Sequence, residues 1–327
     1  MTSDRNQEAA LLGALFSAGG PGLNRRALAR ASGLSANDLE QILAPYIDAG
    51  YPIEFHPHGT VSLREPPDVW CAEEIIGRCP TGANLPAWNP LLLAETASTN
   101  DVAREQGRKG TASGFLVAAS RQTAGRGRLG RAWESPPNRG LYVSILQRPD
   151  LSLTEAGKLT ILSSVAAVDA VEAISGLRPQ IKWPNDLVLN GRKLAGLLIE
   201  TERKADRLSF AVIGIGINVR HQAGDFSPEV RALATSLYLA TDHLYRRADL
   251  LVALLQALER RLALPFAETR EAWTSSSLTL GQRVSLTTTR GIKHGQAMGL
   301  DESGALLLRN DSGEVETVTS GDMQAVS

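Results

Sequence analysis

Residues 121–131 read Arg121-Gln122-Thr123-Ala124-Gly125-Arg126-Gly127-Arg128-Leu129-Gly130-Arg131, which places four arginines and three glycines in eleven positions. Glycine lets the backbone bend and approach a ligand closely, and arginine presents a planar, permanent cation that binds carboxylate or phosphate. The segment therefore predicts a loop that closes over an anionic substrate. Taken alone, such a run is more often a solvated surface loop or a nucleic-acid contact, so the interpretation depends on the rest of the chain.

On either side of this loop, the chain alternates between strand and helix patterns. Short apolar runs predict strands, and two longer amphipathic or buried stretches predict helices. This alternation favours an α/β or α+β fold built on a mixed sheet. The expected strands are 91–94, 116–120, 141–146, 188–189, 194–200 and 210–219, and the expected helices are 154–175 and 248–264.

The first 64 residues predict three short helices followed by a hairpin. Asn24 and Gly33 are expected to cap the second helix, and Ser35 with Asp38 predicts a capping box for the third. A turn at 56–59 between two short strands predicts a β-wing. This order is that of a winged helix-turn-helix. The apolar face expected for the third helix consists of Leu39, Ile42, Leu43, Tyr46 and Ile47.

Beyond residue 277, short strands punctuated by glycines replace the helices, which predicts a small β-barrel or sandwich. Glu65-Pro66-Pro67 is a stiff, extended segment and predicts the first linker. We therefore expect an α+β protein of three domains, at 1–66, 67–277 and 278–327. The C-terminal strands are expected at 283–288, 294–300, 305–309 and 314–319.

Composition narrows the class of protein without choosing a function. The chain has 327 residues, is 43% hydrophobic and carries a net charge of −1, so bulk charge favours neither nucleic acid nor a membrane. Cys71 and Cys79 match no zinc or redox spacing and are expected to be unpaired. The sequence shows no signal peptide and no membrane-spanning run, so we expect a soluble cytoplasmic protein without a membrane partner.

Two polar clusters outside the loop suggest a binding site. Ser98-Thr99-Asn100 offers two hydroxyls and an amide for a polar, uncharged ring, although an ordinary helix cap is the simpler interpretation of that triplet alone. Lys182-Trp183-Pro184-Asn185-Asp186 ends a strand at a proline, and Lys193 follows. A lysine suits an acyl or phosphoryl oxygen, while an aspartate can orient that lysine or hold a metal. Alone, Lys193 would be a solvent-facing hairpin lysine and Asn185-Asp186 a turn.

A glycine-rich strand end is the third candidate. Gly214-Ile215-Gly216-Ile217-Asn218 closes the apolar run that begins at Phe210. Its glycines permit either close approach of a nucleobase or tight packing of a buried strand, and the sequence does not decide between them. No Gly-x-Gly-x-x-Gly or Gly-Lys-Ser/Thr fingerprint is present, which disfavours a Rossmann site and a P-loop.

Taken in order, these segments resemble the biotin protein ligase family over about a hundred residues. With the flanking winged helix and β-module, the layout is similar to the bifunctional ligase and biotin-operon repressor. The resemblance implies a catalytic fold related to class II aminoacyl-tRNA synthetases and an SH3-like C-terminal module. The matching motifs are Ser98-Thr99-Asn100, Gln122 with Gly125-Arg126-Gly127-Arg128, Lys182-Trp183-Pro184-Asn185-Asp186, Arg192-Lys193-Leu194-Ala195-Gly196 and Gly214-Ile215-Gly216-Ile217-Asn218.

The resemblance also implies a reaction and its participants. Biotin and ATP would give biotinyl-5′-adenylate and pyrophosphate with Mg²⁺ as cofactor, and the biotinyl group would pass to a lysine of a biotin carboxyl carrier protein of acetyl-CoA carboxylase. Operator DNA and a second copy of the chain are further candidate partners.

The site residues implied by the resemblance fall into three overlapping sets, and no metal ligand is assigned. The catalytic set is Arg126, Arg128, Asp186 and Lys193. The biotin set is Ser98, Thr99, Asn100, Gln122, Gly125, Arg126, Arg128, Lys193 and Gly196. The nucleotide set is Arg128, Arg131, Trp133, Asn185, Gly214, Gly216 and Asn218.

The expected recognition helix departs from a DNA-binding pattern, because no lysine or arginine occurs between Ala31 and Leu63. Pro45 also falls inside that helix and is expected to bend or shorten it. Two alternatives to a biotin ligase remain. A lipoate-type ligase would need an apolar tunnel, which the neutral Ser98-Thr99-Asn100 cluster disfavours. A regulator that only senses a ligand would not need the ligase motifs.

Overall fold

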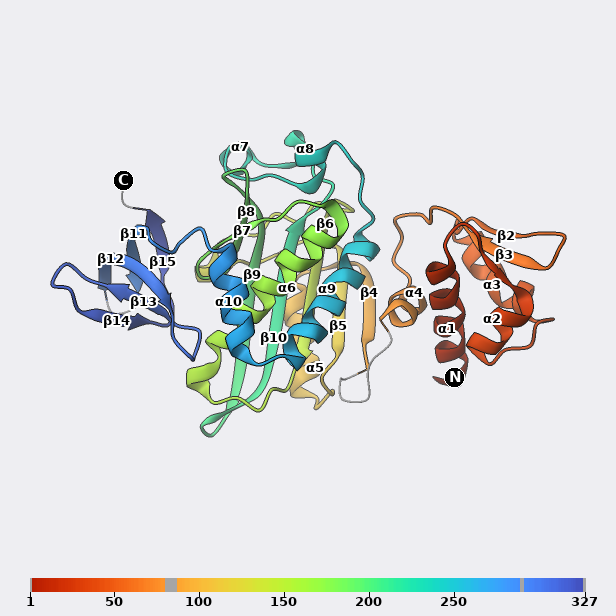
Figure 1. The fold of residues 1–327 in the computed structure, drawn as a ribbon, viewed down its shortest axis with the longest axis horizontal. Helices are drawn as coiled ribbons and strands as arrows, with labels where there is room; N and C mark the ends of the chain where they lie inside the picture. The colour runs from red at the N-terminus through yellow and green to blue at the C-terminus, as the bar shows by residue number, and fades with distance from the viewer. Residues whose placement is uncertain (1, 80–86, 289–290, 326–327) are drawn as a thin grey trace.

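Three β-sheets follow one another along the chain (Figure 1). The structure, a computed structural model, describes residues 2–79, 87–288 and 291–325. The N-terminal helices lie at one end of the molecule, the largest sheet lies in the middle, and the C-terminal sheet lies at the other end (Figure 1). The chain therefore has the α+β class and the mixed central sheet expected from its sequence.

The N-terminal region forms a winged helix-turn-helix, with three helices and an antiparallel sheet of order β1-β3-β2. Asn24 caps α2 through its side chain, and Gly33 ends that helix in the left-handed conformation, as predicted. Leu11, Leu28 and Leu43 are fully buried in one shared core. The elements are α1 (Thr2–Ala18), β1 (Leu23–Asn24), α2 (Arg25–Ser32), α3 (Leu39–Asp48), β2 (Ile53–Phe55) and β3 (Thr60–Leu63).

Two details of the predicted third helix are wrong. The Ser35 hydroxyl accepts a hydrogen bond within a preceding turn, and α3 instead begins at Leu39 after Asp38, which makes no side-chain cap bond. Ile47 is 39% exposed, because Tyr46 takes the buried position and the next residue lies about 100° further round the helix. The helix continues through its internal proline to its end at Asp48.

The central sheet has seven strands in the order β4-β5-β6-β10-β9-β8-β7. Strands β4 and β5 run parallel, whereas the other neighbouring pairs are antiparallel. The expected strands are all present. The strands are β4 (Asn89–Thr96), β5 (Phe115–Gln122), β6 (Gly140–Gln147), β7 (Gln180–Lys182), β8 (Asp186–Leu189), β9 (Arg192–Lys204) and β10 (Arg207–Asn218).

Helices cover both faces of this sheet. On one face, α6 (Gly157–Ser175) and α9 (Arg247–Ala263) pack over the main core (Figure 1). On the other face, α5 (Thr99–Arg108) packs against a smaller apolar cluster that includes Phe115 and Phe210. Alternate residues of each strand point to opposite faces, so one strand contributes to both clusters.

The first of the two predicted helices, expected from residue 154, starts later than expected. Ser152 and Glu155 form a capping box around the short turn Leu153–Glu155, and the α-helix follows from Gly157. Further helices in the described ranges are α4 (Ala72–Arg78), α7 (Pro228–Arg231), α8 (Leu237–Thr241) and α10 (Phe266–Ser276).

The C-terminal sheet has five antiparallel strands in the order β14-β13-β12-β11-β15, where four were expected. The additional strand is β15, whose four residues are too few and too polar to produce a strand pattern. Two hydrogen bonds attach the segment before this sheet to β7 and the residue after it: Leu278 N–H donates to the Ile181 carbonyl, and Trp183 N–H donates to the Thr279 side-chain Oγ1, both at 2.9 Å. The strands are β11 (Arg283–Thr288), β12 (Gly291–Leu300), β13 (Leu306–Arg309), β14 (Val315–Val318) and β15 (Asp322–Ala325).

Cys71 and Cys79 carry free thiols, as expected. None of the helices in the described ranges combines the length and the apolar character needed to span a bilayer.

Candidate active site

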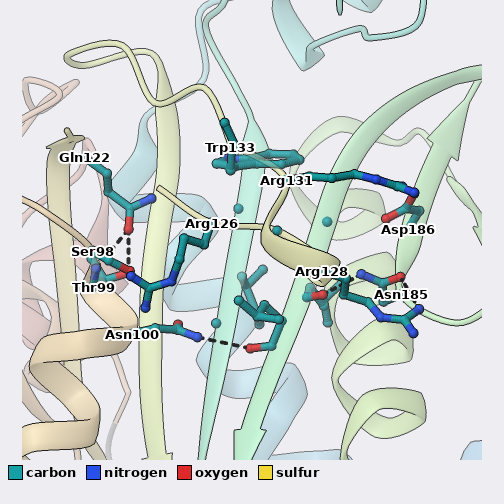
Figure 2. A pocket seen from close by; sticks show the side chains of 18 of the residues that line it. Ser98, Thr99, Asn100, Gln122, Arg126, Arg128, Arg131, Trp133, Asn185 and Asp186 are labelled. Carbon is teal, nitrogen blue, oxygen red and sulfur yellow. Dashed lines mark hydrogen bonds between the residues drawn. The ribbon is translucent and has the colours of Figure 1, made fainter. Parts of the chain in front are cut away.

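A pocket opens on the central sheet where four segments meet (Figure 2). The start of α5, the loop between β5 and β6, the β8–β9 hairpin and strand β10 all contribute to its lining. Fourteen of the sixteen site residues proposed from the sequence line this pocket. They are Ser98, Thr99, Asn100, Gln122, Arg126, Arg128, Arg131, Trp133, Asn185, Asp186, Lys193, Gly196, Gly214 and Gly216.

One side of the pocket, the neutral end, consists of Ser98, Thr99, Asn100 and Gln122 (Figure 2). Ser98 is the N-cap residue of α5, so the triplet both starts a helix and lines a pocket. The backbone N–H and the hydroxyl of Thr99 donate to Gln122 Oε1 at 2.9 and 3.1 Å. Gln122 Nε2 in turn donates to Ser135 Oγ at 3.0 Å. This end is therefore preformed and carries no formal charge.

A buried network behind the neutral end fixes Asn100. Ser144 Oγ lies 2.7 Å from Thr99 Oγ1 and 2.6 Å from Asn100 Oδ1, and Asn100 Nδ2 donates to Glu200 Oε2 at 2.7 Å. Gly214 provides the space, because a Cβ at that position would lie 2.2 Å from Asn100 Oδ1. Asn100 thus belongs to the packed wall of the pocket as much as to its surface.

Arg128 and Arg131 lie on the other side of the pocket, near Asn185 and Asp186, and Lys193 contacts Asp186, whereas Arg126 reaches back to Asp101 of α5 (Figure 2). We call these four cations together the cationic end. Three of these cations each contact one carboxylate. The six side chains in these contacts are between 26% and 63% exposed, so each ion pair is weak and can exchange partners. The pairs are Arg126 with Asp101 at 2.6 Å, Lys193 with Asp186 at 2.7 Å, and Arg131 with Asp322.

Arg128 differs from the other three cations because its contacts are neutral. Its Nη1 donates to the Gly321 carbonyl at 3.1 Å and to Asn185 Oδ1 at 3.4 Å. Burial lowers the pKa of the Arg128 guanidinium, while the nearby Asp322 and Asp186 carboxylates act in the opposite direction. Arginine remains protonated in proteins, so Arg128 is a partly buried cation aimed at neutral oxygens.

Trp133 lies across strand β10. A Cβ on Gly216 would come within 2.6 Å of the Trp133 indole nitrogen, and Lys193 Nζ lies 5.5 Å from the indole ring centroid. The Trp133 Nε1 donor is buried and has no acceptor among the described residues. In this structure, the two glycines of β10 therefore make room for side chains of the chain itself.

Two of the sixteen residues, Gly125 and Asn218, do not line this pocket. Gly125 packs closely on the loop, where a Cβ would lie 2.5 Å from the Trp133 carbonyl oxygen. Asn218 is 3% exposed and donates through Nδ2 to the Thr235 carbonyl at 2.9 Å, which holds the segment after β10 against the sheet. A neighbouring apolar cavity is lined by Arg131, Ala132, Trp133, Glu134, Lys193, Asn218, Phe226, Val230, Leu233 and Ala234.

A buried histidine supports the segment that borders this apolar cavity. His221 stacks on Phe226 with ring centroids 4.9 Å apart, and its Nε2 lies 3.3 Å from the Tyr142 hydroxyl. Burial lowers the pKa of His221 to about 4, so its imidazole is neutral near pH 7.

Seven lining residues were missed from the sequence. Four of them, Gly127, Ala132, Leu197 and Ile215, adjoin proposed residues in the sequence, Leu198 follows Leu197, and Val143 pairs with Ile215 across strands β6 and β10. Asp322 comes from the C-terminal sheet, 191 residues after its partner Arg131. Only the fold brings that carboxylate to the loop. The missed residues are Gly127, Ala132, Val143, Leu197, Leu198, Ile215 and Asp322.

The described residues contain no group of three or more His, Cys, Asp and Glu side chains that could hold a metal ion. The carboxylates that line the pocket, Asp186 and Asp322, each contact a cation. Magnesium at nucleotide sites uses one or two carboxylates together with phosphate oxygens and water. One pocket carboxylate, such as Asp186 beside Lys193, is sufficient for that mode of binding.

Comparisons with known proteins agree with this geometry. Residues 92–218 match the model of the biotin/lipoate A/B protein ligase family, and residues 279–325 match the biotin protein ligase C-terminal domain. The chain is 37% identical to the bifunctional ligase/repressor BirA of Bacillus spizizenii, over 70% of this chain and 71% of that protein. It is 34% identical to the biotin–[acetyl-CoA-carboxylase] ligase of Paracoccus denitrificans, over 68% of this chain and 95% of that protein.

A solved structure has the same fold. The biotin protein ligase of Aquifex aeolicus, in complex with biotin and ATP, aligns with a TM-score of 0.61 and 30% identity, over 72% of this chain and 97% of that one. The family match, the coverage of these relatives and the fold all agree, and the chain belongs to the biotin protein ligase family.

Proposed function

We propose that the chain is an ATP-dependent biotin protein ligase, which forms biotinyl-5′-adenylate and transfers the biotinyl group to a lysine of a carrier protein. The observation that carries this proposal is the pairing of a preformed neutral end with a four-cation end in one pocket. Biotin has an uncharged polar ring system and an anionic carboxylate, and ATP brings further anionic groups. We also propose that the three sheets mark three domains, at 1–66, 67–277 and 278–327.

The neutral end suits the ureido group of biotin. In our assignment Ser98 and Thr99 present hydroxyls to the ring, while Gln122 fixes Thr99 through two accepted hydrogen bonds. Because these groups already hold one another, binding needs little reorganisation, and that preorganisation favours affinity. Asn100 and Gly214 form the wall on which the ring would rest.

The cationic end suits the reacting carboxylate and phosphate. The biotin carboxylate attacks the α-phosphorus of ATP, the bond to the β-phosphate oxygen breaks, and pyrophosphate leaves. No enzyme nucleophile is needed, so catalysis rests on positioning and on stabilising negative charge. We assign Lys193, oriented by Asp186, and Arg126 and Arg128 to the oxygens around that centre. Magnesium bound with ATP would neutralise phosphate charge, and its protein ligand is left unassigned.

The apolar cavity beside Trp133 suits a nucleobase. It lies next to the cationic end, shares Arg131, Trp133 and Lys193 with the first pocket, and has Phe226 in its wall. Asn218 contributes by holding the cavity's outer segment through Thr235. In the second step, the carrier lysine amine attacks the adenylate carbonyl carbon and AMP leaves.

The test is biotin-dependent exchange between ATP and labelled pyrophosphate, followed by incubation with a purified biotin carboxyl carrier domain. We expect exchange with biotin and not with lipoate, and a carrier heavier by one biotinyl group. Exchange that requires lipoate would favour the lipoate-type ligase instead. Binding of biotin without exchange or carrier modification would favour a ligand-sensing regulator.

Operator binding is a second candidate function, favoured by the winged helix-turn-helix and by repressors among the relatives. The exposed surface of α3, the expected recognition helix, argues against tight binding of DNA. Glu40, Gln41 and Ala44 are exposed on α3, and Arg25 ion-pairs with Glu40 and covers the Phe55 ring. A gel shift with the biotin promoter of the source organism, with and without adenylate, tests this. Adenylate-dependent binding would establish the repressor function, and sedimentation in the same samples would reveal a homodimer.

A further inference from the structure

Asp322 brings a carboxylate from the C-terminal sheet into the cationic end of the pocket. Both of its oxygens accept hydrogen bonds from the two Nη atoms of Arg131, one of them at 3.2 Å. The preceding residue, Gly321, accepts a hydrogen bond from Arg128 at 3.1 Å. Two arginines of the loop therefore donate hydrogen bonds to two consecutive residues at the start of β15, in a different sheet.

Asp322 and Arg131 are held by the fold in different ways. Asp322 is the first residue of β15 and pairs with Thr287 of β11, within a sheet whose preceding segment is bonded to β7. Arg131 lies on the loop, where its side chain is 63% exposed, compared with 35% for Asp322. The carboxylate is thus held by strand pairing, while the guanidinium belongs to a side chain that is mostly exposed on the loop.

Asp322 lies close to several positive charges, as a bound anionic ligand would. Hydrogen bonding to Arg131 is the main cause of a lowered pKa for this carboxyl, with further contributions from the charges of Arg128 and Lys182. Asp322 therefore stays ionised at neutral pH, and two of the cations near it, Arg128 and Arg131, line the pocket. A phosphate entering the cationic end would meet both the same guanidinium and this negative charge.

We propose that the Asp322 carboxylate mimics the anionic substrate. It binds the Arg131 guanidinium until a phosphate group of ATP or of the adenylate displaces it. The inference rests on the proposed function and deepens it, because it assigns the C-terminal sheet a direct role in nucleotide affinity. Asp322 positions Arg131 over the pocket and weakens ATP binding by competition and repulsion.

The test is the variant Asp322→Asn, which removes the charge and keeps the shape. Exposed ion pairs are weak, so we expect the KM for ATP in pyrophosphate exchange to fall about two- to fivefold, with the KM for biotin unchanged. The effect should shrink as salt is added, because salt screens exposed charges. Arg131→Ala should raise the KM for ATP, and Asp322→Asn added to that variant should have no further effect.

Asp311→Asn is the matched control, since Asp311 forms an ion pair with Arg283 at 2.7 Å on the same sheet and lines none of the pockets described above. It should leave both KM values unchanged. An unchanged or raised KM for ATP in Asp322→Asn, or an equal decrease in the Arg131→Ala background, overturns the inference. Absence of biotin-dependent exchange in the wild-type protein would instead reject the proposed function itself, so the two failures are distinguishable.

Discussion

The two ends of the pocket are held in different ways. At the neutral end, Thr99, Gln122 and Ser144 bond to one another, and Thr99 and Ser144 are buried. At the cationic end, three of four cations rest on partly exposed carboxylates, and one of those carboxylates, Asp322, comes from another sheet. Buried hydrogen bonds are costly to break, whereas exposed ion pairs exchange at little cost.

This difference indicates how one pocket can bind two kinds of group. A rigid neutral end selects a ring by shape and hydrogen bonding. An exchangeable cationic end accommodates groups whose charge changes during a reaction, from a free carboxylate and a triphosphate to an adenylate. Substitutions confined to one end should therefore leave binding at the other end largely unchanged.

Lys193→Ala should have the largest effect. The lysine lines the cationic end and is oriented by Asp186, so its loss removes charge stabilisation at the reacting phosphate. We expect pyrophosphate exchange to fall by roughly 10²–10³-fold, a range typical for removing such a group, with biotin binding largely retained. Lys109→Ala is the control, because Lys109 forms a comparable pair with Glu105 on the surface. Normal exchange in Lys193→Ala would reject a catalytic role.

Gly214→Ala should damage the neutral end. The added Cβ would lie 2.2 Å from Asn100 Oδ1, so the buried network must shift. Overpacking of this kind costs roughly 1–3 kcal/mol, and we expect a lower melting temperature together with weaker biotin binding by calorimetry. Gly299→Ala in β12, where nothing lies within 4 Å of the new Cβ, should change neither quantity. Equal biotin affinity in wild type and Gly214→Ala would show that the wall tolerates the shift.

His221 gives the stability of the fold a pH dependence at the segment that borders the apolar cavity. Its folded pKa is about 4, below the ordinary value of 6.5, so the unfolded chain binds the proton first as pH falls. Stability is therefore fully present above pH 6.5 and is lost progressively as pH falls toward 4, by up to about 2 kcal/mol between pH 7 and pH 5.

The measurement is chemical denaturation of wild type and His221→Asn at both pH values. We expect the variant to lose less stability on acidification than the wild type, and the exposed-histidine control His58→Asn to behave as the wild type. Identical pH slopes for wild type and His221→Asn would show that the pKa of this histidine is the same in the folded and unfolded chain, and would overturn the prediction.

Arg128→Gly should have the smallest effect on biotin and a selective effect on the adenylate. Because the Arg128 guanidinium is bonded only to neutral oxygens, a ligand phosphate can take it without displacing a carboxylate. We expect release of the activated ester to accelerate roughly tenfold, equivalent to one charge-assisted hydrogen bond, with biotin affinity nearly constant. Arg121→Gly is the control, since Arg121 pairs with Glu95 and does not line the pocket. Unchanged release from Arg128→Gly would contradict this assignment.

Local pattern predicted most of the fold. Strands such as Phe115–Gln122 and helices such as Arg247–Ala263 follow from apolar spacing, and the α2 cap at Asn24 follows from its side chain. The failures are also physical. The Ser35 capping box did not form because a turn intervenes before Leu39. Strand β15 was not predicted because its hydrogen bonds come from a distant strand, β11.

The candidate site shows the same division. Lys193, Asp186 and Arg128 were proposed from motifs, because their residue types in that order already suit phosphate and carboxylate chemistry. Ser144 and Glu200 were not, because a serine and a glutamate within strands carry no signal of their own. Their importance comes from the network that they complete around Asn100.

The order of motifs along the chain determined by itself the family, the glycine/arginine loop and the residue types that meet an anion. The tertiary structure alone decided which cation receives which partner: Asp101 for Arg126, Asp186 for Lys193, and neutral oxygens for Arg128. It also placed Asp322 against Arg131 across 191 residues of sequence. Residue chemistry is a local property of the chain, whereas charge pairing depends on distances that exist only after the sheets have packed together.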